Sequence, residues 1–410
     1  MPPPPAIPGP RLSAMMFLQF FIWGGWYVTV GNFMAARGLG DAIYWAYTVG
    51  PIAAIVSPFF LGMVADRFFP TQRILGILHL LGALAMLAAP MAAEQGPTPF
   101  ILVLLLHMLC YMPTLGLSNA IAFRHLASQE KGFPLVRVFG TIGWIAANLV
   151  VSAGLHADTG PAQFWVTSAA GLALGLYSFS LPHTPPPAAG RPASIRDILG
   201  LDALAMLRDR SFAVFLVSSF LLCIPLAAYY AYAPVYVKAS GFENAGATMS
   251  LGQMSEIVFM LAMPAFFAFL GVRWMLLLGM LAWVIRYALF AAAAPGGPQW
   301  MILAGIILHG ICYDFFFVTG FIYTDRRAGP RVRAQAQGLL VLVTQGLGLG
   351  VGAQVMGLVE KSARAADGAM DWRTFWLFPL VGAAIVAVAF FALFRERGST
   401  PSEVRPERSG

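Results

Sequence analysis

The chain has 410 residues, of which 59% are hydrophobic and 10% are charged, and its formal net charge at pH 7 is +7. Soluble proteins carry about a quarter charged residues, so this chain has too few ionisable side chains to cover a surface that faces water. The composition excludes a soluble globular protein and indicates one embedded in lipid. The Pro-rich start lacks a basic stretch followed by a short apolar run and a cleavage site, so we expect no removable signal peptide.

Twelve apolar segments are long enough to cross a bilayer as helices. A crossing needs about 20 mostly apolar residues, because each helical residue rises about 1.5 Å and the hydrocarbon layer is about 30 Å thick. The segments cover residues 14–36, 42–65, 74–93, 99–123, 134–156, 162–181, 212–237, 246–270, 274–294, 299–323, 332–358 and 373–394. We therefore predict an all-α membrane protein with twelve transmembrane helices.

The basic residues are unevenly divided between the two sides of the predicted membrane. If the N-terminus is cytoplasmic, the inside segments carry 18 lysines and arginines and the outside segments carry five. This asymmetry follows the positive-inside rule, so we expect both termini in the cytoplasm. The positive charge then reflects topology, and we predict no nucleic-acid partner.

A polar interruption at residues 182–211, rich in proline and arginine, divides the apolar segments into six and six. A linker between two six-helix bundles is the architecture of major facilitator transporters, whose substrate site lies between the halves. We predict a first bundle over residues 1–181, a linker over 182–211, a second bundle over 212–397 and a cytoplasmic tail over 398–410. A channel or a polytopic enzyme would not predict this symmetric division.

The loop after the second segment reads Gly62-Met-Val-Ala-Asp66-Arg67. It resembles the Gly-x-x-x-Asp-Arg signature that major facilitator proteins carry between their second and third helices. The resemblance implies a gating role for Asp66 and Arg67. The corresponding loop of the second half keeps only the basic residue, Arg273.

Two carboxyl side chains lie inside predicted spans, where a charge is costly and usually functional. Glu256 is in the eighth segment and shares a helix face with Gln253, three residues earlier. A carboxyl that alternates between its protonated and ionised forms is what proton coupling requires; the alternative is a structural hydrogen bond to another helix. Asp314, in the tenth segment, is either a second proton carrier or the partner of an intramembrane cation.

Two arginines also lie inside the predicted spans. Arg137 shares a helix face with Thr141 and Trp144, at spacings of four and seven residues. Because a buried guanidinium must be paired or face water, we predict a gate or a substrate contact, with snorkelling to the cytoplasm as the alternative. Arg286 needs a buried acid, and we predict an ion pair with Asp314 as the structural role of both.

The first segment carries aromatic and amide side chains at helical spacing, and we predict that Gln19, Trp23, Trp26 and Thr29 line a cavity. Flat aromatic faces with a few polar groups suit a heteroaromatic ring. The alternative role for the aromatic rings is helix packing. Tyr230, in the seventh segment, adds aromatic surface.

Other polar groups inside the spans are assigned structural roles. The histidines have no clustered partners and are predicted to be satisfied buried imidazoles: His79, His107 and His309. The cysteines sit in apolar runs and are predicted to be small buried hydrophobes: Cys110, Cys223 and Cys312. With no metal-ligand cluster, nucleophile elbow or phosphate-binding loop, we predict no metal, no cofactor and no enzymatic activity.

Six short motifs resemble those of the bacterial nucleoside:proton symporters, a family of the major facilitator superfamily. In chain order they are Phe17-Leu-Gln19-Phe-Phe-Ile-Trp23-Gly24, Tyr111-Met-Pro113-Thr114-Leu-Gly116-Leu, Arg137-Val-Phe-Gly140-Thr141-Ile-Gly143, Gln253-Met-Ser255-Glu256, Asp314-Phe315-Phe316 and Ala336-Gln337-Gly338. The resemblance implies proton-coupled nucleoside import by alternating access, in a multi-pass protein of the bacterial inner membrane. It implies a nucleoside or proton role for Arg137, Thr141, Gln253, Glu256 and Asp314, and we also expect Phe315 to contact the substrate.

The seventh segment departs from this family, because Ala227 and Tyr230 stand where family members offer amide side chains, and Trp144 replaces a smaller aromatic residue. Lost hydrogen-bond partners can change discrimination by orders of magnitude in a dry site. An oligosaccharide or a modified nucleobase therefore stays open as an alternative substrate, as does a receptor that binds without transporting. The expected partners are the solute, protons and lipid, and we expect a monomer.

Overall fold

The computed structural model describes residues 9–61, 68–126, 129–186, 201–294, 296–329 and 332–395. In these ranges the secondary structure is helical, apart from one isolated bridge between Arg364 and Met370. The predicted gating residues Asp66 and Arg67 lie outside the described residues, as do positions 187–200 of the predicted linker and the predicted tail.

The first half of the chain supplies six membrane-spanning segments. They are α1 (Gly9–Tyr27) continued by α2 (Val30–Ala36), α3 (Ile43–Phe60), α5 (Thr71–Glu94), α6 (Pro97–His125), α7 (Gln129–Asn148) continued by the π-helical η3 (Leu149–Gly154), and α8 (Ala162–Ser178). A short 3-10 helix, η1 (Gly40–Ala42), precedes α3. Helix α1 packs against α7 and α8, and α5 packs against α6 and α8.

The second half begins with a 3-10 helix, η4 (Leu201–Arg208), and contains several interrupted spans. Its helices are α10 (Arg210–Ala239), α11 (Ala245–Ala293), the group α12 (Gln299–Ile307), α13 (His309–Tyr313), η5 (Asp314–Val318) and α14 (Thr319–Arg327), the group α15 (Arg333–Val341), η6 (Leu342–Gly348) and α16 (Leu349–Ser362), and finally α17 (Trp372–Leu393). Both η5 and η6 are π-helical.

Ten helical stretches in the described ranges are long and apolar enough to cross a membrane. One of them, α11, has 49 residues, and Gly271 interrupts it with φ 70° and ψ 175°, a conformation that glycine adopts without steric cost. A straight helix of that length would be more than twice the thickness of the hydrocarbon layer, so α11 holds two spans that meet at Gly271. Apolar helix α8, with 17 residues, completes the predicted twelve.

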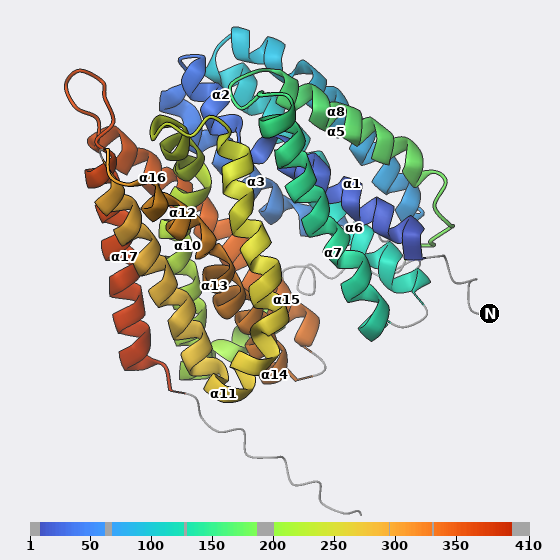
Figure 1. Cartoon of the computed structure of the whole chain (residues 1–410). Helices are drawn as coiled ribbons and strands as arrows, with labels where there is room; N and C mark the ends of the chain where they lie inside the picture. Colours follow the sequence, from blue (N-terminus) through green and yellow to red (C-terminus); the bar gives the residue numbers. More distant parts are fainter. Residues whose placement is uncertain are drawn as a thin grey trace, which may run out of the picture.

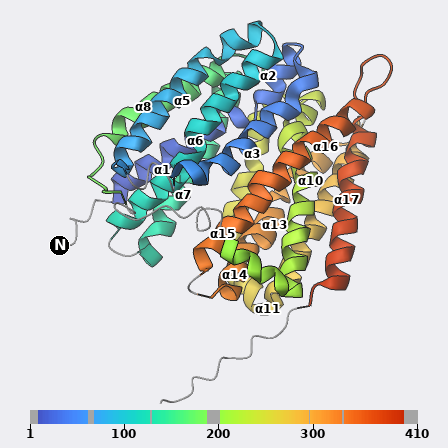
Figure 2. The same cartoon turned by 180° about the vertical axis from the view of Figure 1, so that it is seen from behind.

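The two halves form two bundles that lie side by side. Helices α1 to α8, blue to green, group together, and α10 to α17, yellow-green to red, form the other group (Figures 1 and 2). The bundles touch where α3 meets η6 and α16, where α2 meets α10, and where α11 meets η3. Large apolar side chains such as Leu261 and Phe269 are 80% and 89% exposed, as expected for a surface that lipid covers. The cysteines are free and buried, as predicted.

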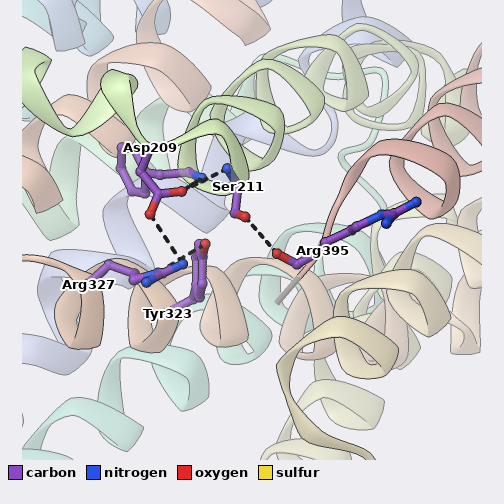
Figure 3. Close-up of polar contacts among 6 residues, drawn as sticks. Asp209, Ser211, Tyr323, Arg327 and Arg395 are labelled. Atoms are coloured by element: carbon purple, nitrogen blue, oxygen red, sulfur yellow. Dashed lines mark hydrogen bonds and ion pairs between the residues drawn. The ribbon is translucent and has the colours of Figure 1, made fainter. Parts of the chain in front are cut away.

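Polar contacts join helix ends of the second bundle at what we call the inner end, where Asp209, Arg327 and Arg395 lie (Figure 3). The Asp209 carboxylate accepts the backbone N–H of Ser211 at 2.8 Å, which caps α10, and pairs with Arg327 at 3.3 Å. The Ser211 hydroxyl donates to the Arg395 carbonyl at 2.6 Å. These contacts hold the starts and ends of α10, α14 and α17 together.

Candidate substrate cavity

A cavity of about 140 Å³ lies between the two bundles. Helices α1 and α7 form its wall on the first bundle, and α10, α11, α13, η6 and α16 form the opposite wall. Its lining residues are Phe20, Trp23, Tyr27, Arg137, Thr141, Trp144, Tyr230, Gln253, Glu256, His309, Tyr313, Gln345 and Leu349. The predicted face of Arg137, Thr141 and Trp144 is therefore one continuous strip of this wall.

The cavity continues toward the inner end. A second hollow of about 390 Å³ shares Arg137 and Tyr313 with the first and extends to Pro58, Asn119 and Phe321, which lie further along their helices in that direction. The central cavity is thus connected to the inner half of the molecule.

Hydrogen bonds join the two bundles at the opposite end, which we call the outer end and which carries Asp158. The Asp158 carboxylate is 3% exposed and accepts the backbone N–H of Ala245 at 2.7 Å, in the first turn of α11. The Gln354 amide of α16 donates to the Thr48 hydroxyl of α3 at 2.8 Å. The bundles are therefore held together on this side of the cavity.

Glycines allow α1 and α7 to approach closely. A Cβ added to Gly24 would lie 2.8 Å from the Trp144 carbonyl oxygen, and one added to Gly143 would collide with the Phe17 carbonyl oxygen. This approach brings the rings of Trp23 and Trp144 to 5.5 Å between centroids, at an interplanar angle of 74°. Such an edge-to-face pair is favourable and gives this wall a flat aromatic surface.

Arg137 extends from α7 beside this aromatic surface. The central carbon of its guanidinium lies 4.1 Å from the centre of the Phe20 ring, which is a cation–π contact. No ion pair joins Arg137 to an acid in the described part of the chain. Its hydrogen-bond donors are therefore available to a molecule in the cavity.

The opposite wall depends on an interruption in the tenth span. Helix α12 ends at Ile307 and α13 begins at His309, and the backbone N–H of Gly310 donates to the Ser255 hydroxyl at 3.0 Å. A Cβ on Gly310 would lie 2.6 Å from the Ser255 carbonyl oxygen, so only glycine permits this contact. The contact places His309 on the same wall as Glu256, which follows Ser255 directly.

A family model described as Nucleoside H+ symporter matches residues 9–399. The chain belongs to the nucleoside H+ symporter family. The putative nucleoside transporter YegT of Escherichia coli K12 is 40% identical over 402 residues, which cover 94% of this chain and 93% of YegT. The nucleoside permease NupG of the same organism is 32% identical over 402 residues, covering 94% and 95%. A xanthosine permease of that organism is 31% identical over a stretch of the same length.

Solved structures agree with this membership. A crystal structure of a NupG mutant matches with a TM-score of 0.87 at 31% identity and covers 94% of this chain and all of that one. A bacterial homolog of the human lysosomal transporter Spinster, at 14% identity, matches with a TM-score of 0.74, which is a likeness of fold alone. The predicted major facilitator fold is confirmed. This nucleoside H+ symporter is a multi-pass membrane transporter and not an enzyme.

Seven of the predicted substrate residues of this nucleoside H+ symporter line the cavity, and four do not. Gln19 is fully buried behind the wall, where its amide nitrogen donates to the Thr114 hydroxyl at 2.7 Å and its oxygen accepts from His79 at 2.9 Å. The Thr29 hydroxyl donates to Gln163 at 3.0 Å. These polar groups hold helices of the first bundle together.

The other two residues outside the cavity are aromatic. Trp26 is fully buried and meets His107 edge-on, at 5.8 Å between centroids. Nδ1 of His107 donates to the Gly82 carbonyl at 3.0 Å, and His79 donates to Gln19 at 2.9 Å. Nε2 of His107 is buried without a hydrogen-bond partner among the described residues, so the prediction of a satisfied imidazole holds only in part for His107. Phe315 packs in an apolar cluster with Met263.

The predicted ion pair between Arg286 and Asp314 is wrong. Asp314 is fully buried, and neither of its carboxylate oxygens has a hydrogen-bond partner among the described residues. Arg286 instead donates to the Gly305 carbonyl at 3.0 Å and to Nδ1 of His309 at 3.2 Å. Asp314 lies five residues beyond His309, which is more than one helical turn further along the span, so the guanidinium meets His309 first.

Sequence reasoning missed several lining residues. Phe20 and Tyr27 lie three residues before and four residues after Trp23, so helical spacing could have identified them. Gln345 is an amide in the middle of an apolar span, which is itself a signal. His309 was assigned a purely structural role because its partner is distant in sequence, yet it lines the cavity.

Proposed function

We propose that this protein imports nucleosides together with protons across the bacterial inner membrane, by alternating access. The observation that carries the proposal is the central cavity, where Arg137 and aromatic rings of the first bundle face Gln253 and Glu256 of the second. The names of the related nucleoside and xanthosine permeases support the substrate class. We propose a monomer as the working unit.

The walls of the cavity suit the two parts of a nucleoside. The rings of Trp23, Trp144 and Tyr230 offer flat surfaces for a base. Arg137 and Gln253 offer hydrogen-bond donors for carbonyl and hydroxyl oxygens. A solute that contacts both walls bridges the two bundles. Its binding therefore favours a conformation in which the bundles lie closer together around the cavity.

Glu256 is the proposed proton carrier. Its side chain lines the cavity opposite Arg137, with no ion pair to it among the described residues. A carboxyl that faces a cation across a cavity responds to the arrival of a polar ligand by changing its protonation. Asp314, buried and without a hydrogen-bond partner in the described part of the chain, is a second proposed carrier.

Alternating access follows from the difference between the two ends. Asp158, Thr48 and their partners join the bundles at the outer end, while the cavity extends toward the inner end. We assign the inner end to the cytoplasm because the predicted inside segments are the basic ones. In this proposal the bundles, residues 1–181 and 212–397, move as units, and Asp66 and Arg67 contribute to gating.

Uptake into proteoliposomes tests the proposal. The wild-type protein should accumulate labelled uridine or adenosine when the outside is more acidic than the lumen, and this accumulation should vanish with a protonophore. Glu256→Gln should still bind nucleoside but lose pH-driven accumulation, because an amide cannot carry the proton. Glu243→Gln, on an exposed loop at the outer end, is the matched control. Failure of the wild type to accumulate any nucleoside would remove the substrate assignment.

A modified nucleobase or an oligosaccharide is the second candidate substrate. The α10 wall presents the ring of Tyr230, where the family resemblance leads us to expect an amide. A thermal-shift screen of nucleosides, nucleobases and sugars separates these classes, because a ligand of the folded state raises the melting temperature.

A further inference from the structure

Arg286 is a buried cation without an acid. Its side chain is fully buried, and no ion pair reaches it from the described residues. Its Nε–H donates to the Gly305 carbonyl at 3.0 Å, and its Nη2 lies 3.2 Å from Nδ1 of His309. The guanidinium also lies over the ring of Tyr229, 4.0 Å from its centre. A cation placed at this cost must serve either stability or the neighbouring cavity.

The contact with Arg286 determines which nitrogen of His309 carries a proton. A guanidinium has only donors, so Nδ1 of His309 must be the acceptor. A nitrogen whose lone pair accepts a hydrogen bond bears no proton, and the neutral ring then carries its hydrogen on Nε2. His309 is consequently a fixed N–H donor in this structure.

The ring of His309 is also held in orientation. It stacks on Tyr229 at 5.1 Å between centroids with an interplanar angle of 15°, so Tyr229 supports both His309 and Arg286. Behind it, a Cβ on Gly252 would lie 3.0 Å from the Cβ of His309. Since Nδ1 is occupied by Arg286 and His309 lines the cavity, Nε2–H is the polar group that the ring offers to a solute.

We propose that His309 is a substrate-selecting hydrogen-bond donor and that Arg286 is the positioning residue that fixes its tautomer. The pair selects a solute with an acceptor atom at this wall, such as a carbonyl oxygen or an unprotonated ring nitrogen of a nucleobase. A base that presents an N–H there is rejected because two donors face each other. The proposal rests on the nucleoside function and specifies which atoms of the base the cavity recognises.

The pair also separates selection from proton coupling. With its Nδ1 lone pair occupied by a permanent cation, His309 does not take up a second proton while that contact persists. Proton coupling is therefore assigned to the carboxyl groups of Glu256 and Asp314, and His309 binds the solute without changing its charge.

Two measurements test this inference. In the first, protein labelled with ¹⁵N in its six histidines gives ring ¹⁵N spectra, and the His309 signals are assigned by their loss in His309→Gln. We expect an unprotonated Nδ1 and a protonated Nε2 in the wild type. We expect exchange between tautomers in Arg286→Met, where the guanidinium is gone. A protonated Nδ1 in the wild type would overturn the proposal, and this result needs no variant at position 286 to fold.

In the second measurement, equilibrium binding compares nucleosides with analogues that lack one acceptor: adenosine with its 1-, 3- and 7-deaza forms, and uridine with analogues that lack a base carbonyl. For one of these analogues the Kd of the wild type should rise roughly tenfold, the effect of leaving one donor without its hydrogen bond. His309→Phe should lose that discrimination, whereas His309→Gln, which keeps an N–H donor, should retain part of it.

The outcomes separate this inference from the proposed function. If the wild type binds nucleosides but discriminates against the analogues no better than His309→Phe does, the selecting role is overturned and nucleoside binding stands. If the wild type binds no nucleoside at all, the proposed function fails, and the ¹⁵N spectra still decide whether Arg286 fixes the tautomer.

Discussion

Each bundle carries an arginine inside a membrane-spanning helix, and each arginine lies over an aromatic ring. Arg137 of the first bundle is 4.1 Å from the centre of Phe20, and Arg286 of the second is 4.0 Å from the centre of Tyr229. The two arginines differ in their exposure to the cavity. Arg137 lines the cavity, whereas Arg286 is fully buried behind His309.

This difference determines what each guanidinium can do. Gly305 accepts from Nε–H of Arg286 and His309 accepts from Nη2, while Nη1 is buried without a partner among the described residues. Arg286 does not line the cavity, so its effect reaches the solute through His309. Arg137 has no ion pair in the described ranges and keeps its donors for a solute. Two side chains with the same charge and the same kind of stacking thus separate into a binding residue and a positioning residue.

The largest expected effect is the loss of transport in Arg137→Gln. The substitution removes a charged donor from the cavity wall, and we expect uptake of nucleoside to fall by roughly 100-fold, the scale of about 3 kcal/mol for a charged hydrogen bond. The melting temperature should stay close to that of the wild type, because the donors of Arg137 face the cavity. Labelled uptake and thermal melting of the same preparation measure both.

Arg373→Gln is the control for Arg137, because this arginine is exposed at the outer end, away from the cavity. Its uptake should match the wild type. Near-normal uptake in Arg137→Gln, or a melting temperature that falls together with uptake, would assign Arg137 to structure and remove the contrast with Arg286.

The number and order of the spans could be predicted from the sequence because few backbone structures are stable inside a bilayer. Every backbone polar group in the bilayer must be bonded internally, so a long apolar segment becomes a helix. What apolar length does not predict is where a span is interrupted. The break at Leu308 and the π-helical turn that begins at Asp314 depend on contacts with other helices, such as the bond from Gly310 to Ser255.

Site residues could be predicted from the sequence where they share one face of a single helix. The spacing of Arg137, Thr141 and Trp144 places them together on any α-helix, and the structure puts all three on the cavity wall. The spacing cannot decide which face of an apolar helix meets the cavity. Helix α1 packs against α7 and α8, so Gln19 and Trp26 face other helices while Trp23 faces the cavity.

The predicted partner of Arg286 was wrong for a related reason. Choosing between His309 and Asp314 requires the register between the ninth and tenth spans, and a single sequence holds no signal for that register. The bundle fixes it through close contacts, such as that of Gly305 with the ring of Phe290, 2.5 Å from a Cβ added at the glycine. Once the register is fixed, the guanidinium meets Gly305 and His309.

A smaller effect distinguishes the arginines by conservative substitution. Arg286→Lys keeps the charge but cannot reproduce two donors in a planar fork. It leaves a buried acceptor unsatisfied on Gly305 or His309, at a cost of about 1–3 kcal/mol. We therefore expect a lower melting temperature, whereas Arg137→Lys should melt like the wild type and lose affinity for nucleoside. Equal melting temperatures for the two lysine variants would contradict the division into binding and positioning residues.

The smallest expected effect concerns the ring beneath Arg137. Phe20→Leu removes a cation–π contact worth about 0.5–1 kcal/mol at a partly exposed site, so the guanidinium should be less well oriented and the Kd for nucleoside should rise by about two- to fivefold. Phe21→Leu is the matched control, because Phe21 is the next residue on α1 and does not line the cavity. Titration calorimetry of both variants measures the difference. If the two leucine variants bind nucleoside equally well, the Phe20 ring does not orient Arg137 for the solute. The arginine–ring contacts of both bundles would then contribute to helix packing alone.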